Sequence, residues 1–295
     1  MKTCLVGYTP DYAGQEALAL AVSLTAHSGS NIVVCTVIPE VWGHPSFGSS
    51  VDQDYGKFLA EHATNALNQA REQLGDVPNA RFIKYGASSA TVGLTEAAKQ
   101  EGADIIVLGS SRSGSTGRLS MGGVSSEIMH VAEVPVAMAP RDHRVKTSPS
   151  ISRLTCAYSG LEAASGTVLE ALGMATALGV PLRLVSFAVR DRQMYPSLVG
   201  YQAERAIADE WRIQAEATLE RVRTQLSGHE PPIEVAVAEG ETWDDAMNHL
   251  DWLPGEVLAV GSSRMGMIQR VFLGSNANKI MRASPVPVMI LPKVS

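Results

Sequence analysis

Short apolar segments alternate along the chain with longer segments whose apolar residues recur at helical spacing. Residues 32–38 are nearly continuous in β-branched residues, which is typical of a strand buried on both faces. Residues 13–26 show helical spacing, and Gly29 ends that helix. Such alternation favours a parallel, doubly wound α/β sheet. The first half of the chain predicts strands at 5–8, 32–38, 80–85, 104–108 and 134–139, and helices at 13–26, 52–74, 89–100 and 125–131.

The second half of the chain repeats the first. The segment VLGSSR at 107–112 recurs as AVGSSR at 259–264, and Gly122 recurs as Gly274, both with an offset of 152 residues. A constant offset over such a stretch indicates a duplicated unit. The second copy therefore predicts strands at 154–158, 182–187, 233–238, 257–260 and 286–291.

The duplication predicts two domains of the same fold. We place the first domain at 1–141, a linker at 142–152 and the second domain at 153–295, each with a doubly wound parallel sheet of five strands. The last strand of each copy is an apolar edge that needs covering, and its counterpart can supply the cover. We therefore expect strands 134–139 and 286–291 to meet, so that the domains form an intramolecular pseudo-dimer.

Composition and charge exclude several classes of protein. The 295 residues are 45% apolar and 18% charged, which argues against disorder. A formal charge of −6 gives no general attraction to nucleic acid or anionic lipid. No apolar run reaches the roughly 18 to 20 residues that a membrane span needs, and the first residues do not form a signal-peptide core. We expect a cytoplasmic protein with no nucleic-acid or membrane partner.

The cysteines and histidines do not indicate a metal site. Cys4, Cys35 and Cys156 stand in apolar, strand-like segments, and we expect them to be small buried residues. The seven histidines show no metal-ligand spacing with cysteine. Four aromatic residues have two open interpretations, closing over a ligand or packing in the core: Trp42, Phe47, Trp243 and Trp252.

Glycine and serine cluster where the fourth strand of each copy ends. Open parallel sheets bind ligands at the carboxyl ends of their strands, so these residues are the candidates for chemistry. In the second copy Gly261, Ser262 and Arg264 follow the strand, and Gly274, Ser275 and Asn276 open the next helix. Free backbone N–H groups, hydroxyls and the helix dipole there can hold a phosphate chain. The alternative is that glycine and serine only form turns and caps.

This spacing resembles the universal stress protein family, whose nucleotide-binding members carry G-x2-G-x9-G-[ST] before the last helix and a Val-Pro-Val final strand. The second copy matches with Gly261, Gly274 and Ser275, while Arg264 replaces the second glycine. The first copy has the corresponding residues Gly109, Ser110, Arg112, Gly122, Gly123 and Ser125, of which Gly109 and Gly122 match the pattern. The resemblance covers nearly the whole chain as a tandem of two such domains.

The resemblance implies an adenine nucleotide as ligand, ATP with or without Mg²⁺, and a regulatory role in the stress response. Nucleotide-binding members usually end the first strand with an aspartate that faces the nucleoside, whereas this chain has Thr9 and Ser159, with Asp11 displaced. A hydroxyl in place of the carboxylate loses about 1 to 2 kcal/mol of hydrogen-bond energy. The ends of the second strands add Val37 and Phe187 to the candidate nucleotide-binding residues. We expect the second copy to bind more tightly than the first.

Several alternatives stay open at the level of sequence. Arg112 and Arg264 either clamp phosphates or fill the site by pairing with a carboxylate. A slow ATP-hydrolysing or phosphate-transferring enzyme would use Asp11, Ser125 and the two arginines, although no nucleophile, base and orienter stand out as a catalytic set. A nucleotide-free interaction module is the third function. A homodimer built on the intramolecular pseudo-dimer is a further expected partner.

Overall fold

The computed structural model describes residues 1–40, 50–111, 116–144, 150–160, 165–189, 198–264, 271–272 and 275–292. The first half of the molecule comprises β1 (Thr3–Gly7), α1 (Tyr12–Thr25), β2 (Asn31–Pro39), α2 (Ser50–Leu74), β3 (Ala80–Ala87), α3 (Ala90–Glu101), β4 (Ile105–Leu108), α4 (Gly123–Val131) and β5 (Val136–Met138). The second half comprises β6 (Arg153–Ala157), α5 (Ser165–Leu178), β7 (Leu182–Val189), α6 (Leu198–Gln225), β8 (Ile233–Gly240), α7 (Trp243–Asn248), β9 (Glu256–Gly261), β10 (Ser263–Arg264), β11 (Val271–Phe272), α8 (Ser275–Ala283) and β12 (Val288–Leu291).

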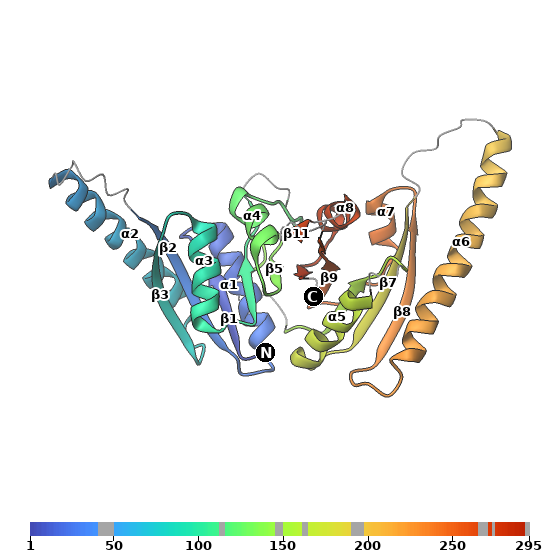
Figure 1. Cartoon of the computed structure of the whole chain (residues 1–295), viewed down its shortest axis with the longest axis horizontal. Coiled ribbons are helices and arrows are strands. Elements are labelled where there is room, and N and C mark those ends of the chain that lie inside the picture. The colour runs from blue at the N-terminus through green and yellow to red at the C-terminus, as the bar shows by residue number, and fades with distance from the viewer. Residues whose placement is uncertain are drawn as a thin grey trace.

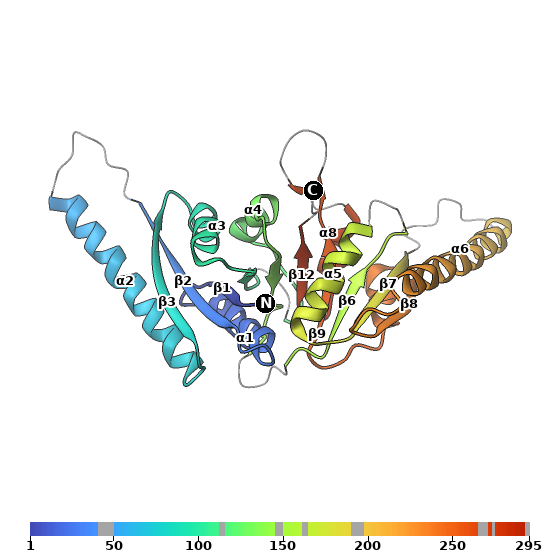
Figure 2. The ribbon, with the colours of Figure 1, turned by 60° about the horizontal axis from the view of Figure 1, so that its bottom comes forward.

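The two halves share one ten-stranded sheet with the order β3-β2-β1-β4-β5-β12-β9-β6-β7-β8 (Figures 1 and 2). All pairs inside each half are parallel, and the halves join through the antiparallel pair β5 and β12, in which Ala137 lies opposite Met289. The predicted fold class and the predicted contact between the last strands are confirmed. Both strands begin later than expected, because Pro135 and Pro287 have no N–H to give to the ladder.

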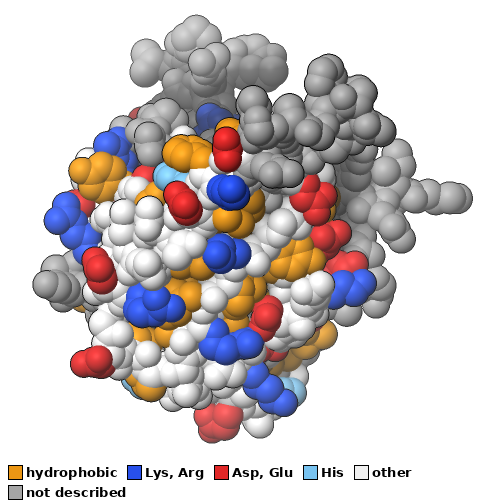
Figure 3. Space-filling model, turned by 90° about the vertical axis from the view of Figure 1, so that its left-hand side faces the viewer, with side chains coloured by type: hydrophobic (Ala, Val, Ile, Leu, Met, Phe, Trp, Pro, Cys, Tyr) orange, Lys and Arg blue, Asp and Glu red, His pale blue; other side chains and the backbone are white. Residues whose placement is uncertain are grey.

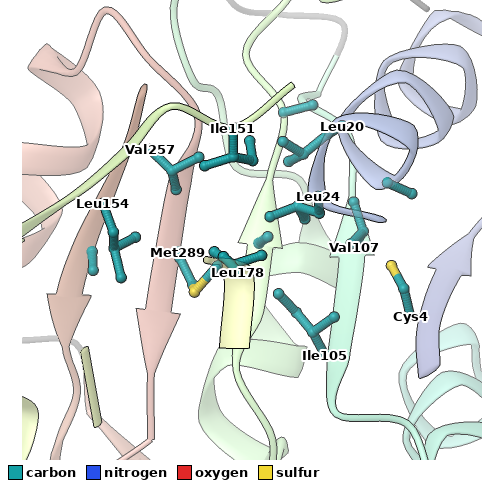
Figure 4. Packing of buried hydrophobic residues seen from close by; sticks show 14 of the residues in the cluster. Cys4, Leu20, Leu24, Ile105, Val107, Ile151, Leu154, Leu178, Val257 and Met289 are labelled. Atoms are coloured by element: carbon teal, nitrogen blue, oxygen red, sulfur yellow. The ribbon is translucent and has the colours of Figure 1, made fainter. Parts of the chain in front are cut away.

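Helices cover both faces of each half. In the first half, α1 and α2 pack on one face, whose core includes Cys4 and Val34, while α3 and α4 pack on the other, over Leu5 and Val33. The core under α1 and α2 continues without a break under α5 and α6 of the second half. Figure 4 shows where it crosses between the halves, with Ile151 at the junction.

Ile151 belongs to the predicted linker, yet it is only 4% exposed and its N–H donates to the carbonyl of Ser23 in α1. Residues 145–149 lie outside the described part of the chain. The last part of the linker is therefore docked on the body of the protein. None of the described helices is both long and apolar enough to cross a membrane.

The sheet ends at β3 on one side and β8 on the other. β3 carries the exposed residues Arg81 and Lys84, and charge on an edge strand discourages pairing with another chain. Figure 3 views the molecule from the α2 and β3 side, where acidic and basic side chains are interspersed among apolar ones. The splayed helices α2 and α6 flank the two ends of the sheet (Figure 1).

Candidate functional site

Each half has a point at which the order of its strands reverses. β1 leads through α1 to β2 on one side, whereas β4 pairs with the opposite edge of β1. β6 has the same position between β7 and β9. Ligands of open parallel sheets bind at the carboxyl end of such a reversal. Two segments leave the sheet there, residues 109–122 and residues 261–274, which we call the first and second glycine loops.

The serine that follows the first glycine of each loop is buried and fastened to the last strand of its own half. Ser110 Oγ donates to the carbonyl oxygen of Ala139 at 2.9 Å, and Ser262 Oγ donates to that of Leu291 at 3.0 Å. The matching bonds show that these hydroxyls hold the start of each glycine loop against the end of the last strand. For Ser110 and Ser262 the geometry therefore supports the turn-forming interpretation, and a phosphate contact by their hydroxyls stays a prediction.

The first glycine of each loop is required by a close approach of the first helix of the same half. A Cβ on Gly109 would lie 1.9 Å from the carbonyl oxygen of Ala13 in α1. A Cβ on Gly261 would lie 2.3 Å from the Thr167 hydroxyl oxygen in α5. The two glycines thus face different chemistry, because a carbonyl only accepts hydrogen bonds, whereas a threonine hydroxyl also donates them.

Thr9 and Asp11 are bonded to each other at the exit of β1. Thr9 Oγ1 donates to Asp11 Oδ1 at 2.7 Å, and the N–H of Gly14 donates to the same oxygen at 3.1 Å. Asp11 is therefore the N-cap of α1. Ser159 is exposed at the corresponding exit of β6. The displaced aspartate therefore has a structural role at the start of α1, and its use in catalysis stays a prediction.

The helices that follow the glycine loops begin without an acidic residue in their first turn. α4 has Gly122 as its N-cap with no side-chain hydrogen bond, and Gly123 is exposed with no atom within 4 Å of an added Cβ. Ser125, in the first turn of α4, is buried. α8 begins at Ser275, and Asn276 is exposed. Such helix ends favour an anion.

Two of the predicted residues, Arg112 and Gly274, lie outside the described part of the chain. Arg264 belongs to β10, which pairs with β11 in a short hairpin within the second glycine loop. The sequence pattern did not predict this hairpin. β11 lies against α4 of the first half, so the second glycine loop reaches across the boundary between the halves (Figure 1).

The residues at the ends of the second strands differ between the halves. Val37 packs under α3, where a Cβ on Gly93 would lie 2.6 Å from its Cγ1 atom. Phe187 instead packs against Trp243, with ring centroids 6.0 Å apart. The indole Nε1 of Trp243 is buried and has no hydrogen-bond partner among the described residues. The packing interpretation holds for Trp243 and also for Trp252, whereas Trp42 and Phe47 lie outside the described residues.

Glu16 is a buried carboxylate beside the first glycine loop that sequence reasoning missed. Its side chain accepts a hydrogen bond from the backbone N–H of Asp142 at 2.6 Å. Burial raises the pKa of Glu16, while the backbone N–H groups of Asp142 and Ser110 and the charge of Arg141 counteract this effect. The available signal was a charged residue directly before the apolar run 17–21, at a position where the second copy has Gly166.

The cysteines have the inert environment that was expected. All three are buried and free, and burial raises the pKa of Cys4, Cys35 and Cys156 to about 12. A thiol with such a pKa is not a nucleophile at neutral pH. No group of His, Cys, Asp or Glu that could hold a metal ion occurs among the described residues.

The repeated unit is recognised by a model of the Universal stress protein family, which matches residues 1–140 and again residues 151–292. The chain belongs to the universal stress protein family. Universal stress protein Rv2319c of Mycobacterium tuberculosis H37Rv is 35% identical over 293 residues, which cover 98% of this chain and 99% of that relative. Universal stress protein Rv2005c of the same organism is 26% identical over 254 residues, 85% of this chain and 80% of the relative.

The fold also has solved counterparts. The crystal structure of a universal stress protein from Archaeoglobus fulgidus DSM 4304 matches with a TM-score of 0.64 and 18% identity, covering 99% of this chain and 98% of that one. This likeness extends over both halves. Against the glycine pattern quoted above, this universal stress protein has Arg112 and Arg264 in place of the second glycine, and Gly123 in place of the serine or threonine in the first copy.

Proposed function

We propose that this universal stress protein binds an adenine nucleotide, with ATP as the expected ligand, and acts as a regulatory protein of the stress response. The observation that carries the proposal is the second glycine loop, which leaves the sheet at the strand reversal and leads into the first turn of α8. That turn has no acidic residue, and Gly261 faces the hydroxyl of Thr167. The backbone N–H groups at the start of α8 and the hydroxyl of Thr167 are donors that suit a phosphate chain.

The site that we propose is stronger in the second half. Ser275 supplies a hydroxyl at the start of α8, where α4 has Gly123. Phe187 lies near the end of β7, where the first half has Val37. An aromatic face stacks well on a base. Arg264 adds a positive charge on the loop itself.

Regulation follows from contacts that each glycine loop makes with the other half. Arg118, in the first glycine loop, pairs with Asp244 of α7 at 2.7 Å and donates to the carbonyl of Ala283 at the end of α8. In the opposite direction, β11 of the second loop lies against α4. A ligand that binds only one arrangement of a loop stabilises that arrangement and the contact between the halves that depends on it.

A calorimetric titration of the full chain with ATP tests the proposal. We expect saturable binding that Gly274→Val weakens at least tenfold, because a bulky side chain blocks the approach of phosphate to the backbone. Gly122→Val is the matched control, since an added Cβ there meets its nearest neighbour, Ser111, at 3.6 Å. Equal losses in both variants would contradict the ranking of the halves, and absence of ATP binding at millimolar concentration would refute the proposal.

A phosphate-transferring enzyme has less support. Asp11 is engaged as the N-cap of α1, and Ser125 is buried in α4. We therefore expect ATP to be released unchanged. Phosphate release measured on the same preparation checks this expectation, because turnover that disappears in Gly274→Val would favour the enzyme.

A further inference from the structure

A hydrogen-bond acceptor lies against the first residue of the first glycine loop. The carbonyl oxygen of Ala13 reaches so close to Gly109 that a Cβ there would lie at 1.9 Å, and the carbonyl carbon of Ala13 would lie at 2.5 Å. Because both atoms belong to the backbone of α1, they cannot rotate away as a side chain would. A phosphate oxygen is itself an acceptor and finds no partner in a carbonyl.

Glu16 adds a full negative charge at the same place. It lies one turn after Ala13 on α1 and is only 4% exposed. Its Oε1 atom accepts from the N–H of Asp142 at 2.6 Å, the N–H of Ser110 faces the same carboxylate, and its Oε2 atom has no hydrogen-bond partner among the described residues. A carboxylate thus already occupies the neighbourhood of a backbone N–H of the first glycine loop.

The bond from Asp142 to Glu16 fixes the path of the chain after β5. Asp142 has a φ of 73°, in the left-handed region that non-glycine residues seldom adopt. Two backbone bonds between Arg141 and the first glycine loop hold the same segment, from the N–H of Gly117 to the carbonyl of Arg141 and from the N–H of Arg141 to the carbonyl of Arg118. Glu16 therefore sits in an ordered environment that joins α1, the loop and the chain leaving β5.

The described part of the second half has no carboxylate at the position of Glu16. Gly166 takes that position at the offset of 150 residues; it is exposed, and a Cβ added to it meets no atom within 4 Å. Gly261 lies against the Thr167 hydroxyl. A carboxylate beside the first glycine loop disfavours an anion there, because like charges close together are unfavourable.

We propose that Glu16 closes the first half to phosphate by placing its own carboxylate at the first glycine loop, so that only the second half takes up a nucleotide. Glu16 is in this sense a specificity-determining residue between two sites of the same fold. The inference rests on the proposed function.

Substitutions of Glu16 test its role in the full chain, with the number of ATP molecules bound per chain as the readout. The wild type is expected to bind one. Glu16→Gln keeps the shape of the side chain and removes its charge, and Glu16→Gly copies the residue of the second half; each is expected to create a second, weaker site. Circular dichroism confirms that each variant is folded. Glu101→Gln, which removes the charge of the carboxylate paired with Arg81 at the end of α3, is the control.

The outcomes separate this inference from the proposed function. Two ATP molecules bound by the wild type, or one bound by both folded Glu16 variants, would overturn the inference and leave nucleotide binding intact. No ATP bound by any variant would refute the proposed function, and the inference with it.

Discussion

The two halves share a topology but fill the same part of their sheets with opposite chemistry. Near the amino ends of the strands in the first half, Leu5 and Val33 pack under α3 in an apolar cluster. The corresponding residues of the second half are Thr155 and Arg183, which lie opposite each other on β6 and β7. Both are buried, in a group of hydrogen-bonded and charged side chains.

The centre of this polar group is Glu256, which is 1% exposed. Its carboxylate pairs with Arg153 at 2.9 Å and with Arg183 at 2.6 Å, and it accepts a hydrogen bond from Thr155. The backbone carbonyl of Asp251 accepts from both guanidinium groups. A buried charge is tolerated only when it is paired and hydrogen-bonded in this way.

The length of one helix explains the difference. α3 (Ala90–Glu101) covers the first half, but its counterpart α7 ends at Asn248, and Pro254 disfavours helix in the segment that follows. The loop after α7 places Trp252 over the guanidinium of Arg183, 5.2 Å from its ring centroid. The comparison teaches that the shared core under α1, α2, α5 and α6 maintains the fold, while the opposite face can be rebuilt.

The largest effect is expected from breaking the polar group. Glu256→Ala removes the carboxylate partner of the buried Arg183 and leaves Arg153 paired only with the more exposed Glu234, so it should lower the free energy of unfolding by about 3 to 5 kcal/mol. Asp104→Ala, at the equivalent position before β4, removes an exposed acceptor of the Thr3 N–H at 2.9 Å and should cost about 1 kcal/mol. Urea denaturation measures both. Similar losses at the two positions would contradict the comparison.

A second contrast concerns the glycines that precede α3 and α7. A Cβ on Gly240 would lie 2.3 Å from the backbone nitrogen of Ala246, whereas one on Gly86 would meet its nearest atom, in Glu40, at 3.8 Å. Gly240→Ala should therefore destabilise the protein by about 2 to 3 kcal/mol. Gly86→Ala should be neutral or stabilise it by up to about 1 kcal/mol. The same denaturation experiment checks the pair, and a tolerated Gly240→Ala would show that α7 is not tightly packed on β8.

The two loop arginines sharpen the comparison at the candidate site. If Arg264 clamps phosphate, Arg264→Ala should weaken ATP binding by about 1.5 to 3 kcal/mol and adenosine binding much less. Arg112→Ala in the first half is the matched control and should leave ATP affinity unchanged. Parallel titrations with both ligands decide the matter: an equal loss for ATP and adenosine, or tighter ATP binding, rules the clamp out.

A smaller effect depends on pH. His143 is largely buried, its Nε2 has no partner among the described residues, and burial lowers its pKa to about 4. Because the unfolded chain protonates this histidine near pH 6.5 and the folded chain does not, stability should fall by about 1 to 2 kcal/mol as the pH drops from 7 to 5. His143→Leu should reduce that loss. Identical losses for wild type and variant between the two pH values would exclude the histidine as the cause.

Much of the fold followed from the repeat, because the offset of 152 residues identified two similar units and their last strands as natural partners. The site was less predictable. The roles of Ser110 and Asp11 depend on short-range turn and cap geometry that glycine and serine spacing alone does not distinguish from ligand binding. Glu16 and Thr167 approach the glycine loops only through the packing of α1 and α5, which sequence spacing does not encode.

The most direct test of the central claim, a single nucleotide site in the second half, is native mass spectrometry of the full chain incubated with ATP. We expect one nucleotide per chain in the wild type and in Gly122→Val, and none in Gly274→Val. An unliganded wild type, a wild type with two nucleotides, or a nucleotide retained by Gly274→Val and lost by Gly122→Val would contradict the claim.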